Sequence, residues 1–117
     1  MKILVVGSNG MLGSDLILEL QKTRHQVIGT GRMDLDITDQ DAVKRFIQHQ
    51  RPRWVLLTAA FTNVDECETR RGLASSVNTE GAHYVASASL EVGARLCYIS
   101  TDYIFNGNKA EPYTEDD

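Results

Sequence analysis

The 117-residue sequence predicts an open, doubly wound parallel α/β sheet. Short apolar runs rich in valine and isoleucine are typical of strands that are buried on both faces, and they alternate with longer segments whose apolar residues recur at helical spacing. The first strand, helix and strand together take about thirty residues, the length of one βαβ unit. Ordinary globular composition, with 42% hydrophobic and 24% charged residues, fits a single folded domain.

The amino-terminal half of the pattern begins with a strand at 3–6, a helix at 11–22 and a second strand at 27–28. A short extended strand at 34–37 follows, and Thr38 is placed to cap the next helix. That helix carries Val43, Phe46 and Ile47 inward and stops at Pro52.

The second half continues with a strand at 54–57 and a polar loop at 58–69 that has room for one helical turn. A long helical pattern then runs from Ala74 to Leu90 and stops at Gly93. The last strand is expected at 96–99, with loop from 101 to 117. The five strands are expected in the spatial order 3-2-1-4-5.

Composition argues against several classes of function. A formal net charge of −4 provides no clustered cations for nucleic acid or an anionic membrane surface. No apolar stretch approaches the ~20 residues that span a bilayer. Cys67 and Cys97 lack the spacing of a zinc site or a disulfide framework, so no metal site is expected. Free cysteines fit a reducing compartment, and the sequence therefore predicts a cytoplasmic protein.

A glycine-rich turn, GSNGMLG at 7–13, joins the first strand to the first helix. Gly7 allows a tight turn, Gly10 lets the backbone approach a pyrophosphate, and Gly13 lets the helix pack closely on the strand. Free N–H groups and the positive end of the helix dipole then face the phosphates. The turn predicts a dinucleotide site; the alternative is that the three glycines serve packing alone.

The residue after the second strand distinguishes NAD from NADP. An acidic side chain there accepts hydrogen bonds from the ribose of NAD, whereas a basic one pairs with the extra phosphate of NADP. Arg32 occupies this point and favours NADP, the alternative being an exposed loop charge. Asp36, at the end of the 34–37 strand, is placed to reach the adenine amino group with Ile37 beside it; the alternative for Asp36 is a plain turn residue.

Five segments resemble one known family: LDITD at 35–39, AAFTNVD at 59–65, VNTEGA at 77–82, STDYIFNG at 100–107 and PYTEDD at 112–117. Together they make the chain similar to the dTDP-4-dehydrorhamnose reductases, extended short-chain dehydrogenases with a Rossmann NAD(P)-binding domain. The resemblance covers the whole chain, and the STDYIF block is its most specific part.

This resemblance implies NAD(P)H-dependent reduction of the 4-keto group of dTDP-4-dehydro-L-rhamnose, in the biosynthesis of dTDP-L-rhamnose for polysaccharides. By the match, Thr101 is the catalytic hydroxyl that orients the carbonyl oxygen, Thr101 and Asp102 contact the substrate, and Asn78 steadies the site. The predicted cofactor-binding residues are Gly7, Asn9, Gly10, Met11, Leu12, Gly13, Arg32, Asp36, Ile37, Ala59, Ala60, Phe61, Thr62, Asn78, Ile99 and Ser100.

The catalytic tyrosine and lysine of that family, four residues apart, have no counterpart here: Tyr84, Tyr98, Tyr103 and Tyr113 all lack the lysine. In the family this pair follows the PYTEDD stretch. Residues 1–117 are therefore expected to be an incomplete N-terminal NAD(P)-binding domain, truncated after the fifth strand. Such a domain would bind cofactor with little or no turnover and would need residues beyond 117 for the dTDP-sugar.

Alternatives remain open. A non-catalytic regulatory subunit resembling that of methionine adenosyltransferase shares part of this pattern, and so do other nucleotide-sugar epimerases or dehydratases. The 96–99 strand is a hydrophobic edge without the helix that should cover it. It predicts either the N-terminal part of a longer reductase or a shortened product that forms a homodimer through this edge.

Overall fold

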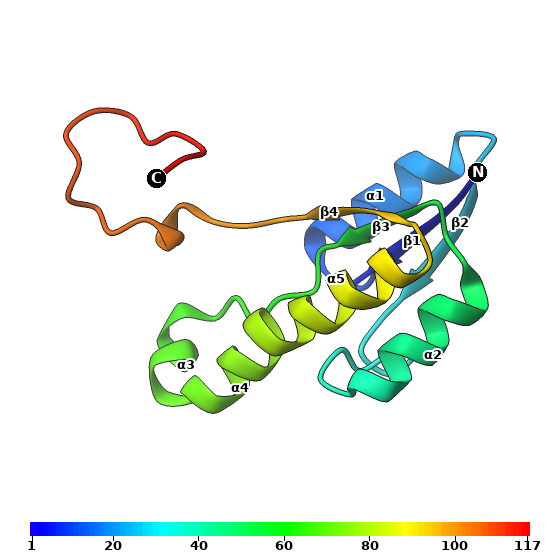
Figure 1. Cartoon of the computed structure of the whole chain (residues 1–117), viewed down its shortest axis with the longest axis horizontal. Coiled ribbons are helices and arrows are strands. Elements are labelled where there is room, and N and C mark those ends of the chain that lie inside the picture. The colour runs from blue at the N-terminus through cyan, green and yellow to red at the C-terminus, as the bar shows by residue number, and fades with distance from the viewer.

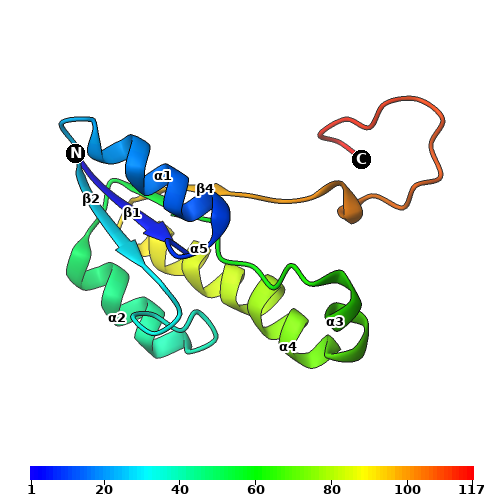
Figure 2. The ribbon, with the colours of Figure 1, turned by 180° about the vertical axis from the view of Figure 1, so that it is seen from behind.

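The computed structural model describes residues 1–117, apart from the side chain of Val64. Four strands form one parallel sheet in the order β2-β1-β3-β4, with α1 on one face and α2 and α5 on the other (Figures 1 and 2). This arrangement confirms the predicted parallel α/β fold. The strands are β1 (Lys2–Val6), β2 (Gln26–Thr30), β3 (Trp54–Leu57) and β4 (Arg95–Tyr98), and the three flanking helices are α1 (Met11–Gln21), α2 (Gln40–Gln50) and α5 (Ala82–Glu91).

The core lies between the sheet and the layer formed by α2 and α5. Successive strand residues point to opposite faces, so alternate residues of β1 and β3 share this side. Across the outer surface of the layer, Lys44 and Gln48 of α2 both donate to the Glu91 carboxylate, at 3.0 and 3.1 Å. The buried residues of this core are Leu4, Val6, Leu35, Ile37, Val43, Ile47, Val55, Leu57, Val85 and Ala88.

The opposite face carries α1 over β1 and β2. Gly29 of β2 lies so close to this helix that a Cβ there would come within 2.9 Å of Ile17 Cδ1. Leu56 and Cys97 share the face by register, but Leu56 is only half-buried and Cys97 is exposed. The part of this face that β3 and β4 form is therefore open to solvent in the described chain.

The prediction of a strand at 34–37 is wrong. The backbone N–H groups of Asp34 and Leu35 donate to the Gly31 carbonyl at 3.1 and 3.0 Å, which folds the segment into a turn. The sheet accordingly has four strands rather than five, and its last strand is the fourth; the order of the strands that remain is as predicted. Leu35 and Ile37 are nonetheless buried, so the apolar alternation reflects burial from a turn.

The helix boundaries also differ from the prediction. Asp39, rather than Thr38, caps α2, because its side chain accepts a hydrogen bond from Ala42 N at 2.9 Å. The long helix predicted to start near Ala74 is divided into α4 (Arg71–Ser75), a π-helical segment η1 (Ser76–Gly81) and α5. The single helical turn expected in the preceding loop is present as α3 (Val64–Thr69).

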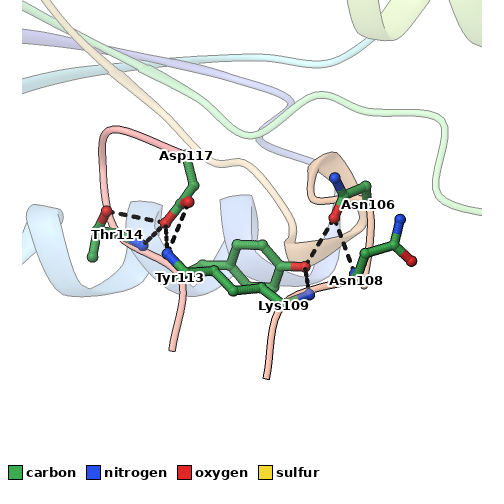
Figure 3. A network of polar contacts seen from close by, with 6 residues as sticks. All are labelled: Asn106, Asn108, Lys109, Tyr113, Thr114 and Asp117. Atoms are coloured by element: carbon green, nitrogen blue, oxygen red, sulfur yellow. Dashed lines mark hydrogen bonds and ion pairs between the residues drawn. The ribbon is translucent and has the colours of Figure 1, made fainter. Parts of the chain in front are cut away.

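After β4 the chain leads away from the sheet as a loop that packs on itself (Figures 1 and 3). A 3-10 turn, η2 (Asp102–Ile104), interrupts it, and the Phe105 and Tyr113 rings stack with centroids 4.3 Å apart. Lys109 Nζ lies 2.7 Å from Asp117 Oδ2. From residue 100 onward, each hydrogen bond that this segment forms is internal, so the tail is held together without the sheet.

The exposed edge strand β4 gives a first testable prediction. An unpaired strand edge pairs readily with another chain, and a charge placed on it opposes that pairing. We expect sedimentation velocity in reducing buffer to show concentration-dependent association of the chain, and Cys97→Lys to reduce it. Ser75→Lys adds the same charge on exposed α4 and should leave the association unchanged. A wild-type chain that stays monomeric at every concentration would show the prediction to be wrong.

Candidate dinucleotide site

A cavity of about 270 Å³ opens at the carboxyl ends of β1, β2 and β3. This edge is where open parallel α/β sheets bind their ligands. The first wall of the cavity is the glycine turn after β1, and the second wall is the turn after β2. The third wall is the segment after β3 together with α4 and η1. The lining residues are Val6, Gly7, Asn9, Gly10, Gly31, Arg32, Leu35, Asp36, Ile37, Thr58, Ala59, Ala60, Phe61, Leu73 and Val77.

Hydrogen bonds to both neighbouring strands fix the glycine turn. The N–H groups of Gly7 and Ser8 donate to Thr30 O at 2.9 and 3.0 Å, and the Thr58 hydroxyl donates to Val6 O at 3.0 Å. Gly7 has a φ of +95°, a conformation that L side chains rarely adopt. A Cβ on Gly13 would overlap the Gly7 carbonyl. Both glycines are therefore required by the shape of the turn.

The amino end of α1 borders this turn and has no side-chain cap. Its N-cap is Gly10, and its first turn contains no acidic residue. The first N–H groups of a helix have no intrahelical partner, and here no side chain replaces one. By contrast, Asp39 caps α2 and Asn63 caps α3. The α1 amides are consequently left for an anion, which the helix dipole also attracts.

The second wall carries two charged side chains, Arg32 and Asp36. Arg32 is exposed and forms no ion pair within the part of the chain that the structure describes. Asp36 Oδ1 accepts from both Thr38 N at 3.0 Å and Thr38 Oγ1 at 2.7 Å. These bonds lower the pKa of Asp36 below its ordinary value, and the nearby positive charge of Arg32 lowers it further. The carboxylate is thus an ionised acceptor.

Asn78 holds the third wall in place from the π-helical segment. Its side-chain oxygen accepts from Phe61 N at 2.8 Å, and its amide nitrogen donates to Phe61 O at 3.0 Å. The Tyr98 hydroxyl of β4 donates to the Asn78 carbonyl at 3.3 Å, and the Arg70 guanidinium lies 6.0 Å from the centroid of the Phe61 ring. Asn78 does not line the cavity itself; it supports a residue that does.

Nine of the predicted cofactor-binding residues line the cavity: Gly7, Asn9, Gly10, Arg32, Asp36, Ile37, Ala59, Ala60 and Phe61. The prediction missed the other six lining residues: Val6, Gly31, Leu35, Thr58, Leu73 and Val77. Leu73 and Val77 are four residues apart, which places them on one helix face, and that spacing is the signal that would have found them. Met11 and Leu12 have exposed side chains, so they would contact a ligand through their backbone amides.

The remaining predicted residues are not brought to the cavity. Thr62 is exposed and does not line the cavity, and Ile99, Ser100, Thr101 and Asp102 follow β4 as exposed residues outside it. Because β4 is parallel to β1, the chain leaves the sheet at Ile99 on the same side as the glycine turn, and Ser100, Thr101 and Asp102 lie on the segment that leads away from it. The Thr101 hydroxyl donates to Asp102 Oδ1 at 3.0 Å. Its catalytic role stays a prediction.

The described residues contain neither a candidate metal site nor a candidate membrane-spanning helix. No group of three or more histidine, cysteine, aspartate or glutamate side chains there could hold a metal ion. Nor does any helix among them combine the length and apolar character needed to cross a membrane.

A parallel sheet with helices on both faces and a glycine turn at the end of its first strand defines a Rossmann-like α/β domain. The family model described as the RmlD substrate binding domain matches residues 1–117. The chain belongs to this family.

Characterised relatives match along almost the whole chain. The chain is 45% identical over 113 residues to a dTDP-4-dehydrorhamnose reductase of Streptomyces griseus, covering 97% of this chain and 37% of the relative. It is 41% identical over 116 residues to the spore coat polysaccharide biosynthesis protein SpsK of Bacillus subtilis, covering 99% of this chain and 41% of the relative. The chain therefore spans about two fifths of the length of these relatives.

Solved structures agree with this assignment. A dTDP-4-dehydrorhamnose reductase from Clostridium acetobutylicum superposes with a TM-score of 0.94 at 44% identity, covering 100% of this chain and 42% of the other. A dTDP-4-dehydrorhamnose reductase from Bacillus anthracis, solved in complex with NADP, gives a TM-score of 0.88 at 41% identity, covering 92% and 38%. The fold of the chain is thus that of these reductases.

Proposed function

We propose that this chain is the cofactor-binding part of an NAD(P)H-dependent reductase that acts on the 4-keto group of a dTDP-linked deoxysugar. The observation that carries the proposal is one cavity with the uncapped amino end of α1 on one side and Arg32 on the other. A dinucleotide with an extra phosphate carries negative charge at both of these places. The names of the relatives and the NADP-bound structure support the same assignment.

The residues present fit such a cofactor. The pyrophosphate would bind the backbone at Gly7, Gly10 and the first amides of α1, where a larger side chain at Gly7 would collide with Ala59 N. Arg32 would pair with the 2′-phosphate of NADP, and Asp36 would accept a hydrogen bond from the adenine amino group. When bound, the reduced nicotinamide supplies the hydride for reduction of a carbonyl.

Reaction with the sugar needs groups beyond these. From the resemblance to the reductase family, we propose that Thr101 orients the carbonyl oxygen and that Asp102 contacts the sugar. None of the four tyrosines is followed four residues later by a lysine, so this catalytic pair is not among residues 1–117. We therefore expect the chain alone to bind cofactor with little or no turnover.

Calorimetric titration of the folded chain tests this proposal. NADPH should bind more tightly than NADH, because only NADPH offers a phosphate to Arg32. Arg32→Glu should weaken NADPH binding by roughly tenfold or more, since one charge-assisted contact becomes a repulsion, and should leave NADH binding nearly unchanged. Arg53→Glu makes the same charge change at the opposite edge of the sheet and should have little effect.

Two results would contradict the proposal at different levels. Absence of heat with both nucleotides, in a sample whose circular dichroism shows a folded chain, would overturn cofactor binding itself. An Arg32→Glu variant with the wild-type ratio of NADPH to NADH affinity would overturn only the role of Arg32 and the NADP preference.

A further inference from the structure

Hydrogen bonds and two buried side chains hold the turn at 31–38 in place. Gly31 N donates to Asp34 Oδ2 at 2.8 Å, and Asp39 N donates to Asp36 O at 3.1 Å. Leu35 and Ile37 are 5% and 6% exposed and anchor the turn in the core on either side of Asp36. All three residues line the cavity, and Asp36, between the two apolar anchors, is the one with an exposed, charged side chain.

The helical element on the far side of the cavity prevents this turn from shifting. Gly81 of η1 lies against Ile37, and a Cβ on Gly81 would come within 2.8 Å of Ile37 Cγ1 and 3.1 Å of Ile37 O. The backbone on both sides of Asp36 is therefore fixed by packing. What remains to be fixed is the rotation of the Asp36 side chain.

Thr38 supplies that last constraint. Its N–H and its hydroxyl both donate to the same carboxylate oxygen, Oδ1 of Asp36, at 3.0 and 2.7 Å. The second oxygen, Oδ2, has no hydrogen-bond partner among the described residues. A carboxylate with one oxygen occupied and the other unoccupied presents a single acceptor in a defined place.

We infer that Thr38 is a positioning residue that makes the cofactor site selective for adenine over 6-keto purines. The inference rests on the proposed cofactor binding. Adenine carries a 6-amino group, which donates to an acceptor, whereas hypoxanthine has an oxygen there, which would face the Asp36 oxygen with no hydrogen between them. Without the Thr38 hydroxyl the carboxylate can rotate, and it then accepts from the N1–H of hypoxanthine as well as from the 6-amino group of adenine. The selectivity for adenine therefore falls.

Two nucleotides that differ only at this position test the inference: NADPH and reduced nicotinamide hypoxanthine dinucleotide phosphate. The wild-type 117-residue chain should bind NADPH about tenfold more tightly, the effect of one hydrogen bond to a charged acceptor. Thr38→Val keeps the shape of the side chain without its hydroxyl and should reduce this ratio to about threefold, because the residue 38 N–H still donates. Thr38→Ser restores the hydroxyl and should restore the ratio.

The outcomes separate the inference from the proposal beneath it. Equal binding of the two nucleotides by wild type would overturn the inference together with the proposed contact between Asp36 and the adenine amino group, while cofactor binding itself would stand. A Thr38→Val variant that keeps the full wild-type ratio would overturn the inference alone. Failure of the folded wild-type chain to bind NADPH would overturn both. A purely structural role for Thr38 would weaken both nucleotides equally in Thr38→Val and leave their ratio unchanged, which would also overturn the inference.

Discussion

Replacing Gly13 by alanine is expected to destabilise the chain by about 3 kcal/mol and to abolish measurable NADPH binding. The new methyl group would overlap the Gly7 carbonyl and lie 2.9 Å from Ser8 Cα. These are backbone atoms of a turn tied to two strands, so they cannot move aside as a flexible side chain would. Urea unfolding followed by circular dichroism measures the loss of stability, and calorimetry measures the loss of binding.

Gly72 provides the matched control. It lies in α4, its φ is not positive, and a methyl group added there would meet no atom outside its own helix within 4 Å. Gly72→Ala should therefore stabilise the chain by about 0.5–1 kcal/mol, the usual gain from alanine in a helix, without altering binding. A Gly13→Ala variant that unfolds at the wild-type urea concentration would refute the geometry assigned to the turn.

Loss of the Asn78 side chain is expected to have the second largest effect. Asn78→Ala leaves the half-buried Phe61 N–H without its partner and leaves the Phe61 carbonyl with only the weak Cys67 thiol donor at 3.5 Å, which costs about 1–3 kcal/mol. The wall that includes Phe61 would loosen, and NADPH affinity should fall about tenfold as a result. Both effects can be measured on the same samples by urea unfolding and calorimetry.

Asn78→Asp separates the two hydrogen bonds. The aspartate still accepts from Phe61 N, but it sets an oxygen beside Phe61 O, so it should not recover the wild-type stability. Asn108→Ala changes an exposed asparagine in the tail and should alter stability by no more than about 0.5 kcal/mol. If Asn78→Ala is as stable as Asn108→Ala, the two bonds to Phe61 contribute nothing.

The parts of the fold that could be predicted from the sequence are those with local causes. The 3–6 run is apolar and β-branched because β1 is buried on both faces, whereas the 54–57 run is apolar with alternate residues fully buried. The predicted bounds of both runs differ from the observed strands by one residue at most. The glycine turn was likewise predictable, because a side chain on Gly7 or Gly13 would collide with backbone atoms of the turn or of the segment after β3. Gly7, Asn9 and Gly10 of this turn are among the nine predicted cofactor-site residues that line the cavity.

The errors have physical causes that lie outside the local pattern. Alternating Leu35 and Ile37 satisfied the period of a strand, yet a turn that reverses at Gly31 buries both of them equally well. Thr38 and Asp39 are both good caps; the Thr38 hydroxyl is used by Asp36, which leaves Asp39 to cap α2. The pairing of Asn78 with Phe61 joins residues 17 apart, and no periodicity encodes it.

The self-contained tail after β4 affects how the melting of this chain is interpreted. Trp54 is the only tryptophan, and it lies within β3 with the Arg95 guanidinium 5.5 Å from the centroid of its ring. Tyr113 sits in the tail, stacked on Phe105. Because tail and sheet share no hydrogen bonds beyond residue 99, tryptophan fluorescence follows the sheet, while tyrosine absorbance also contains the tail. Two midpoints from these two optical signals would mark two separately melting units, each with its own free energy.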